Sequence, residues 1–113
     1  CISVEDLDTS IEKREPVTIV DVRSAEEFAA GHVGGARNIP LPSLEAEAGA
    51  LPRDAVIVTV CGKGGGRSER AAEVLREQGF RKARSLCGGT NAWMASHADR
   101  KEVADESHAL HPQ

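Results

Sequence analysis

The chain has 113 residues, which is enough for one domain with a hydrophobic core and too few for two. Hydrophobic residues make up 40% and charged residues 28%, as in ordinary globular domains, and no apolar run approaches the roughly 20 residues that span a bilayer. The net charge of −4 gives no reason to expect nucleic acid binding, so an anion site must be built locally.

Helix and strand signals alternate along most of the chain. Capping-box patterns at Ser3 and Ser24 predict helix starts, and Gly79 is typical of a helix C-cap. The expected elements are a helix over 3–12, a strand over 17–20, a helix over 24–31, a brief strand over 36–39, helical turns over 43–48, a strand over 55–60, a helix over 68–78, a strand over 83–86 and a turn of helix around residue 93.

This alternation predicts an α/β sandwich with a mainly parallel β-sheet. No internal repeat is present. From residue 96 onward the sequence is polar and lacks periodicity. We therefore expect one domain over residues 1–95 and a polar C-terminal tail over 96–113.

The segment 61–68, Cys-Gly-Lys-Gly-Gly-Gly-Arg-Ser, is the most informative part of the sequence. It lies between the strongest predicted strand and the strongest predicted helix. Its glycines allow backbone N–H groups to turn inward as an anion nest, and the helix N-terminus adds partial positive charge. Both effects favour the thiolate form of Cys61, which is the nucleophilic form.

Three segments that are distant in sequence follow predicted strands: residues 21–23, the Cys61 loop, and residues 86–89. Ligands of parallel sheets bind at the carboxyl ends of the strands. We therefore expect these three segments to meet at the mouth of one site.

The chain resembles the rhodanese family. The residues Asp21-Val-Arg23, Glu27-Phe28, Gly31-His-Val33 and 36–40 (Ala-Arg-Asn-Ile-Pro) are similar to the first signature of that family, and residues 88–93 (Gly-Gly-Thr-Asn-Ala-Trp) are similar to its C-terminal signature. Cys61 stands where the family places its persulfide-forming cysteine. The resemblance covers about residues 17–93, and it implies a three-layer sandwich with helices on both faces of the sheet.

The resemblance implies a sulfurtransferase that moves a sulfane sulfur from a donor such as thiosulfate to a thiophilic acceptor, cyanide or a thiol, through a Cys61 persulfide. A sulfur-acceptor protein is a further expected partner. The substrate- and anion-binding loop is then Gly62, Lys63, Gly64, Gly65, Gly66, Arg67 and Ser68. We expect Arg67 to bind the donor or to anchor the loop through Asp21 or Glu27, and Lys63 either to recruit the anionic donor or to be a solvated charge.

Five residues separate Cys61 from Arg67, one more than in many single-domain rhodaneses. This count is used by cysteine-dependent phosphatases and related arsenate reductases on the same fold, so that activity is an alternative. Val60 disfavours it, since those enzymes commonly carry a His there, and the C-terminal signature favours sulfur transfer. A non-catalytic regulatory module is a third possibility, although it would have little use for Cys61.

Other residues have structural interpretations beside functional ones. Asp21 and Arg23 are expected to form a structural ion pair, and His32 to act as a hydrogen-bonding scaffold residue and not as a general base. Trp93 is expected to pack in the core or the wall of the site. Cys87 is interpreted as a buried inert thiol, with a resolving role toward the Cys61 persulfide as the alternative.

The three cysteines, Cys1, Cys61 and Cys87, form no CxxC pair and suggest no disulfide framework. This pattern favours a reducing compartment, and we expect a cytoplasmic protein, with a mature lipoprotein lipidated at Cys1 as the alternative. His97, His108 and His111 lack zinc-type spacing, so no metal is expected, and sulfur transfer of this kind requires no cofactor.

Overall fold

The computed structural model describes residues 1–97. The expected tail over 96–113 falls almost entirely outside the described residues, and so do His108 and His111.

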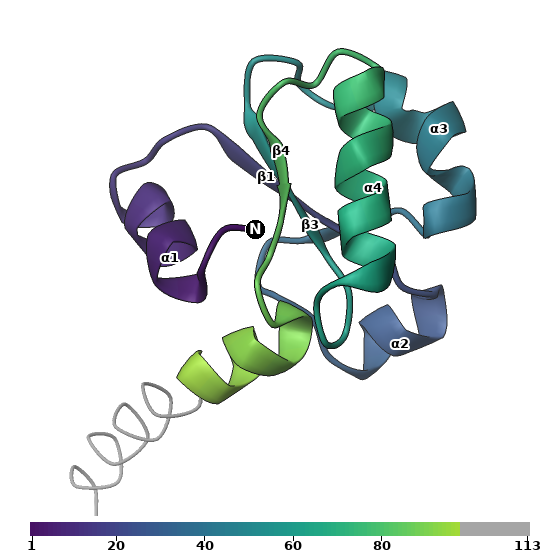
Figure 1. The fold of residues 1–113 in the computed structure, drawn as a ribbon. Coiled ribbons are helices and arrows are strands. Elements are labelled where there is room, and N and C mark those ends of the chain that lie inside the picture. The colour runs from purple at the N-terminus through teal and green to yellow at the C-terminus, as the bar shows by residue number, and fades with distance from the viewer. Residues whose placement is uncertain (98–113) are drawn as a thin grey trace, which may run out of the picture.

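The elements follow the predicted order closely (Figure 1). They are α1 (Val4–Glu12), β1 (Val17–Asp21), α2 (Ala25–Ala30), β2 (Arg37–Asn38), α3 (Leu44–Glu47) between short 3₁₀ turns at Leu41–Ser43 and Ala48–Ala50, β3 (Val56–Val60), α4 (Gly66–Glu77) and β4 (Ala83–Ser85). Residues 89–97 are also helical. Ser3 and Ser24 cap α1 and α2, and Ser24 forms a full capping box with Glu27.

The predicted start of the fourth helix was two residues too late. α4 begins at Gly66, and the Glu69 amide donates to the Gly65 carbonyl at 3.1 Å to close its first turn. Glycine has low helix propensity, so the sequence pattern favoured a start at Ser68. As a result, Arg67 lies within the first turn of the helix and not before it.

The four strands form one parallel sheet in the order β2-β1-β3-β4. The chain moves outward from β1 to β2 in one direction and from β3 to β4 in the other. The point where this direction reverses lies between β1 and β3, where a cleft for ligands is expected in such sheets. The segments 21–23 and 61–66 both emerge there.

Helices cover both faces of this sheet, which confirms the three-layer α/β sandwich. On one face, Leu44 of α3 and Leu75 of α4 pack against strand residues such as Ile57. On the other face, Leu7 of α1 packs with Val58 and Val60, and Trp93 covers the edge of that cluster. The core is aliphatic, as the scarcity of aromatic residues requires.

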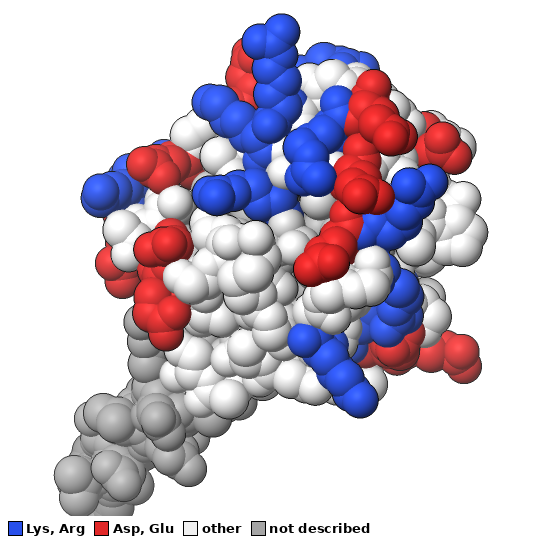
Figure 2. All heavy atoms as spheres, in the orientation of Figure 1, with Lys and Arg blue, Asp and Glu red and all other residues white. Residues whose placement is uncertain are grey.

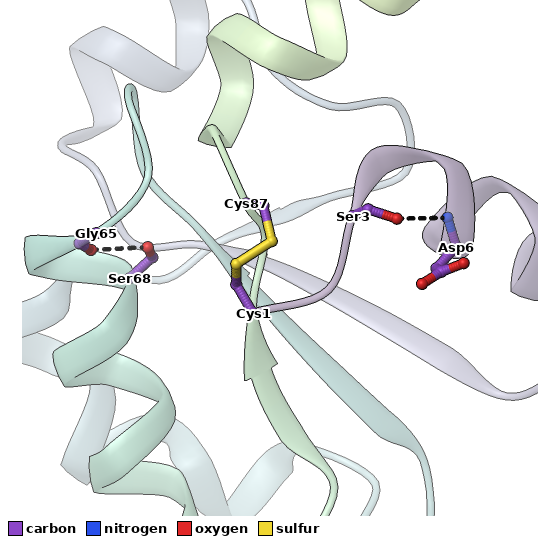
Figure 3. The surroundings of a disulfide bond; sticks show 6 residues. All are labelled: Cys1, Ser3, Asp6, Gly65, Ser68 and Cys87. Carbon is purple, nitrogen blue, oxygen red and sulfur yellow. Dashed lines mark hydrogen bonds between the residues drawn. A yellow bond between two sulfur atoms is a disulfide. The ribbon is translucent and has the colours of Figure 1, made fainter.

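The N-terminal residues join the sheet edge. Ile2 forms a parallel bridge with Leu86, and a disulfide joins Cys1 to Cys87 across 86 residues of sequence (Figure 3). The expectation that the cysteines form no disulfide was therefore wrong, and so was the interpretation of Cys87 as an inert free thiol. Spacing alone does not reveal a single bridge between residues that only the fold brings together.

This disulfide has two consequences for the expectations drawn from the cysteines. The cytoplasmic location loses that support, since disulfides persist mainly in oxidising compartments. In the disulfide-bonded form the Cys1 sulfur cannot also carry a thioether-linked lipid. Within residues 1–97, no helix has the length and apolar character needed to cross a membrane.

Candidate active site

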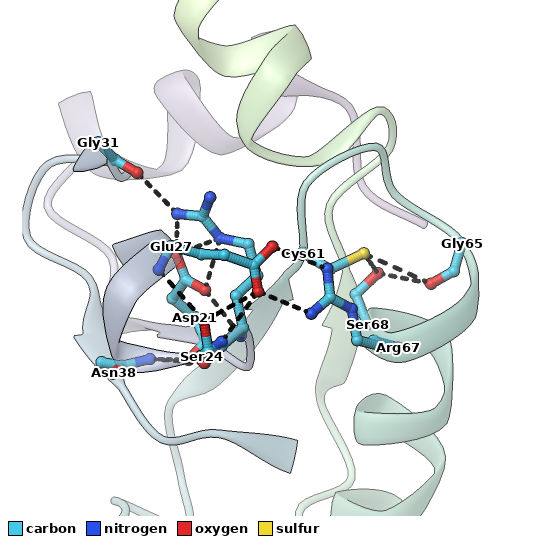
Figure 4. Close-up of polar contacts among 10 residues, drawn as sticks. Asp21, Ser24, Glu27, Gly31, Asn38, Cys61, Gly65, Arg67 and Ser68 are labelled. Carbon is cyan, nitrogen blue, oxygen red and sulfur yellow. Dashed lines mark hydrogen bonds and ion pairs between the residues drawn. The ribbon is translucent and has the colours of Figure 1, made fainter. Parts of the chain in front are cut away.

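The first strand ends in a buried ion pair between Asp21 and Arg23 (Figure 4). Arg23 Nη2 lies 2.8 Å from Asp21 Oδ2, and its Nε donates to the same carboxylate. Asp21 is fully buried and Arg23 nearly so. The hydrogen bond to Asp21 raises the pKa of Arg23 above its ordinary value, although burial opposes this. The pair has the structural geometry expected for these residues.

This ion pair also connects the first strand to the segments that follow it. Arg23 Nη2 donates to the Gly31 carbonyl at 2.7 Å, which fixes the end of α2. The side-chain amide of Asn38 donates to the main-chain carbonyls of Asp21 and Arg23 at 3.1 and 3.0 Å. The segment between β1 and α2 is therefore held by Arg23 at the end of α2 and by Asn38 of β2.

Helix α2 presents a carboxylate to the Cys61 loop. Arg67 Nη1 and Nη2 donate to the two Glu27 carboxylate oxygens at 3.0 and 3.3 Å, a bidentate pair between α2 and α4. The Arg67 hydrogen bond and the Ser24 cap lower the pKa of Glu27 to about 2. Glu27 in turn raises the pKa of Arg67, with a smaller contribution from the nearby Cys61. Of the two anchors expected for Arg67, Glu27 is the one used.

The Cys61 side chain is 4% exposed and lies against the first turn of α4. Its sulfur lies 3.4 Å from Ser68 Oγ and 3.8 Å from the Gly65 carbonyl oxygen, and the Ser68 hydroxyl donates to that carbonyl at 2.9 Å. Thr59 Oγ1 donates to the Ser68 carbonyl at 2.7 Å and holds α4 against β3. Cys61 is therefore placed by the strand on one side and by the helix on the other.

The loop itself requires glycine. Gly64 and Gly65 have φ angles of 83° and 69°, in the left-handed region that other residues rarely adopt. A Cβ atom on Gly64 would lie 2.7 Å from the backbone nitrogen of Gly88. The loop thus packs backbone to backbone against the turn that follows β4, and the third segment meets the first two as the sequence predicted.

Two main-chain hydrogen bonds fasten this contact. The amides of Thr90 and Asn91 donate to the carbonyls of Cys61 and Gly62 at 2.8 and 2.9 Å. Gly89 has φ of 60°, and a Cβ atom there would collide with the Cys61 carbonyl oxygen. The C-terminal signature therefore supports the loop through its backbone.

The remaining predicted residues lie around this centre. Lys63 and Gly66 are exposed, while Gly62 is half-buried. His32 stacks on Phe28, and its Nδ1 lies 2.8 Å from the Phe28 carbonyl oxygen. His97 stacks on Trp93 and pairs with Asp8 at 3.2 Å, so it packs on α1 and is not part of a solvated tail.

Cys87 is bonded to Cys1 and has no free thiol in this structure, so a resolving role would first require reduction of that bond. Sequence reasoning missed the positioning role of Asn38, the pairing of Cys1, and the two amides at Thr90 and Asn91. Asn38 and Thr90 lie within the two signatures. Their contacts involve main-chain groups of other segments, and the sequence does not reveal which main-chain groups the fold brings close. Among residues 1–97, no three His, Cys, Asp or Glu side chains are grouped as a metal site would require.

Charge is mixed on the face shown in Figure 2, where Lys and Arg side chains lie among Asp and Glu side chains and neither sign covers it alone. Because the net charge of the sequence is −4, any attraction of an anion to Cys61 must come from the loop and its immediate neighbours.

Comparison with known proteins agrees with this geometry. The family model described as "Rhodanese-like domain" matches residues 3–96. The chain is 40% identical over 82 residues to the thiosulfate sulfurtransferase GlpE of Shewanella oneidensis, covering 73% of this chain and 80% of that protein. It is 35% identical over 92 residues to the Bacillus subtilis protein YrkF, covering 81% of this chain. The chain spans about half of that relative, 49% of its length.

A solved structure shares the fold. The crystal structure of a rhodanese-related protein from Thermoplasma volcanium superimposes with a TM-score of 0.74 at 29% identity. The match covers 84% of this chain and 90% of that one.

Proposed function

Because the chain belongs to the rhodanese-like domain family, we propose that it is a sulfurtransferase that carries a sulfane sulfur as a persulfide on Cys61. The donor is a small anion such as thiosulfate, and the acceptor is cyanide, a small thiol or a sulfur-acceptor protein. One observation carries the proposal. Of three cysteines, Cys61 alone keeps its thiol, and it lies beneath a glycine-rich loop at the end of β3.

The reaction has two displacement steps. The Cys61 thiolate attacks the outer sulfur of thiosulfate, the S–S bond of the donor breaks, and sulfite leaves with the bonding electron pair. The acceptor then attacks the outer sulfur of the persulfide. Cyanide leaves as thiocyanate, and Cys61 returns to its thiolate form. No electrons are gained or lost over the complete cycle by the protein.

The surrounding residues have separable roles in this proposal. The backbone N–H groups of residues 62–67 stabilise the anionic outer sulfur and the donor oxygens. Ser68 contacts the sulfur and can donate to it after turning away from the Gly65 carbonyl. Arg67 holds the loop through Glu27 while keeping a positive charge near Cys61, and exposed Lys63 attracts the anionic donor.

A phosphatase or arsenate reductase is the second candidate, because residues 62–66 give the five-residue spacing of those enzymes. In such chemistry the arginine binds the tetrahedral oxyanion directly. In this structure the Arg67 guanidinium contacts Glu27. Sulfur transfer is favoured by Val60, which stands where those enzymes commonly carry a His, and by the C-terminal signature at residues 88–93. A regulatory module without catalysis is the remaining alternative.

Intact-protein mass spectrometry after incubation with thiosulfate tests the proposal. We expect a gain of about 32 Da, one sulfur atom, which maps to the Cys61 peptide and is lost on adding cyanide. Cys61→Ser is the matched control and should gain nothing. If the wild type gains no sulfur but hydrolyses a phosphomonoester or reduces arsenate, the second candidate is favoured. If it shows neither the mass gain nor either activity, the regulatory module is favoured.

The contribution of Arg67 is tested separately. Arg67→Gln should raise the KM for thiosulfate more than it lowers kcat if the charge mainly binds the donor, and should lower both kcat and kcat/KM if it mainly positions the loop. Arg70→Gln is the matched control, because Arg70 lies on the same helix and pairs with Glu73 at the surface.

A further inference from the structure

The disulfide connects the N-terminus to the segment that supports the active-site loop. Ile2 N donates to the Ser85 carbonyl at 2.8 Å, and Cys87 N donates to the Ile2 carbonyl at 2.9 Å. The S–S bond between Cys1 and Cys87 locks this short pairing at the sheet edge. Residues 1–2 are thereby held beside the end of β4 by main-chain hydrogen bonds and by the disulfide.

The segment beyond Cys87 is the one that holds the loop. Gly88 lies against Gly64, and the next two amides after Gly89 donate to the carbonyls of Cys61 and Gly62. Between the disulfide and these two bonds lie only two glycines, both with left-handed φ. The turn closes through the Gly89 amide, which donates to the carbonyl of the fully buried Leu86 at 3.1 Å. Cys87 therefore lies between a residue fixed in the core and two glycines of high conformational freedom, and the disulfide adds a second restraint at that point.

The bond is open to small thiols. Cys1 is exposed and lies beside residues of α4, and Cys87 is half-buried. Cys1 borders a surface hollow of about 280 Å³ whose lining includes Arg76 and Arg84. These cationic side chains favour the approach of anionic thiolates, while Glu69 and Glu73 in the same lining oppose it.

We propose that the Cys1–Cys87 disulfide is a redox-controlled positioning element for the Cys61 loop. Two molecules of a small thiol reduce it. The first thiolate attacks one sulfur of the Cys1–Cys87 bond, forms a mixed disulfide with that cysteine and releases the other cysteine as a thiol. The second thiolate attacks the small-molecule sulfur of the mixed disulfide, which releases the remaining cysteine and gives the disulfide of the small thiol. The oxidised form holds the Cys61 loop in place for sulfur transfer. The reduced form releases the turn at residues 87–89, and sulfur transfer becomes slower. The effect on rate rests on the proposed sulfurtransferase function.

Amide hydrogen exchange tests the positioning step without using activity. In Cys1→Ser, and in the wild type reduced with dithiothreitol, we expect the Thr90 and Asn91 amides to lose about tenfold or more in protection through local opening. Because such opening exposes little surface, their exchange should stay insensitive to low denaturant. Amides of β3, which exchange through larger unfolding, report any global change and serve as the internal control.

The activity arm measures the second-order rate constant for a single turnover of sulfite release from thiosulfate, with no thiol or cyanide present, because either could cleave the disulfide. We expect this rate constant to fall about fivefold in Cys1→Ser, equally in Cys87→Ser, and no further in the double variant, because each change removes the same bond. Circular dichroism identifies a variant that fails to fold. In that case the reduced wild type supplies the comparison, measured after the reductant is removed under argon.

Loss of protection at Thr90 and Asn91, together with the same loss of rate in the Cys1 and Cys87 variants, supports the proposal. Unchanged protection at Thr90 and Asn91 overturns it, whatever the rates, and so does local loss of protection in an enzyme whose rate is unaffected. If no form releases sulfite, the proposed function fails, and the exchange data alone decide whether the disulfide positions the loop.

Discussion

At the scale of single residues, the Arg67–Glu27 contact gives a pH prediction. The folded pKa of Glu27, about 2, lies below its ordinary value of 4.5. The stabilisation from this pair is therefore fully present above about pH 4.5 and is lost as the pH falls toward 2. Both side chains are nearly half exposed, so the effect on global stability is small.

Carboxyl-detected NMR titration of Glu27 measures this directly. We expect a midpoint near 2 in the wild type and a clear rise in Arg67→Gln, since the Arg67 hydrogen bond is the largest cause of the shift. Arg70→Gln should leave the midpoint in place. An unchanged midpoint in Arg67→Gln would assign the shift to the Ser24 cap instead.

Thr90 gives a second prediction at this scale. Its side chain is 4% exposed, and Oγ1 has no hydrogen-bond partner within residues 1–97. Thr90→Val keeps the shape and removes the buried hydroxyl, so the free energy of unfolding should stay unchanged or rise by about 1 kcal/mol. Urea denaturation measures it, and a loss of stability would show that the hydroxyl has a partner such as bound water.

The sequence predicted residue roles unevenly. Cys61 and its glycines could be proposed from the sequence because their identities carry the chemistry, and their roles stay predictions. Glu27 was one of two anchors considered for Arg67, and it is the one that Arg67 contacts. The Cys1–Cys87 pair was missed because any two of three cysteines can pair, and only the parallel bridge at Ile2 brings these two together. The Thr90 and Asn91 amides were missed because main-chain donors are the same in every residue.

At the scale of elements, the contact between the Cys61 loop and the turn after β4 depends on Gly89. Gly89→Ala would combine a left-handed φ with a collision against the Cys61 carbonyl. We expect the free energy of unfolding to fall by about 3 kcal/mol and sulfur transfer to fall more steeply than stability alone explains. Urea denaturation and sulfite release provide the two measurements.

Gly49→Ala is the matched control for that change. Gly49 has no atom near its would-be Cβ, so its substitution should leave stability unchanged or slightly raised. Wild-type stability in Gly89→Ala would show that the turn can move away from the loop at little cost.

The elements themselves were largely predictable from local patterns. The capping box at Ser24 and the β-branched run over 56–60 mark their elements without tertiary information. The start of α4 was not predictable, because Gly66 adopts helical geometry only where the Gly65 carbonyl and the strand beside it are already in place. Tertiary contacts there override low helix propensity.

At the scale of the whole molecule, the disulfide closes a loop over 86 residues of sequence, nearly the whole described fold. The chain-entropy account gives a stabilisation of about 4.6 kcal/mol for a loop of this size, chiefly by restricting the unfolded chain. Cys1→Ser should lower the free energy of unfolding by up to that amount. Urea denaturation of the oxidised wild type and the variant measures the difference, and equal stabilities would contradict the account.

The sheet could be predicted at this scale because alternating strands and helices leave few parallel arrangements. The strand order placed the Cys61 loop beside the segment after β1, which the sequence predicted from the strand ends alone. The attachment of residues 1–2 to β4 could not be predicted, since one bridging residue is too short to form a recognisable strand pattern.

The attachment of residues 1–2 to β4 also makes correct disulfide formation depend on the fold. Cys1 lies 86 residues before Cys87 in sequence, and the bridge between Ile2 and Leu86 brings the two together. Three cysteines allow three single bridges, and two of them would consume the Cys61 thiol. In the folded chain, burial of Cys61 shields its thiol. We therefore expect an oxidant added to the unfolded chain to yield mainly isomers in which Cys61 is consumed and sulfur transfer is lost.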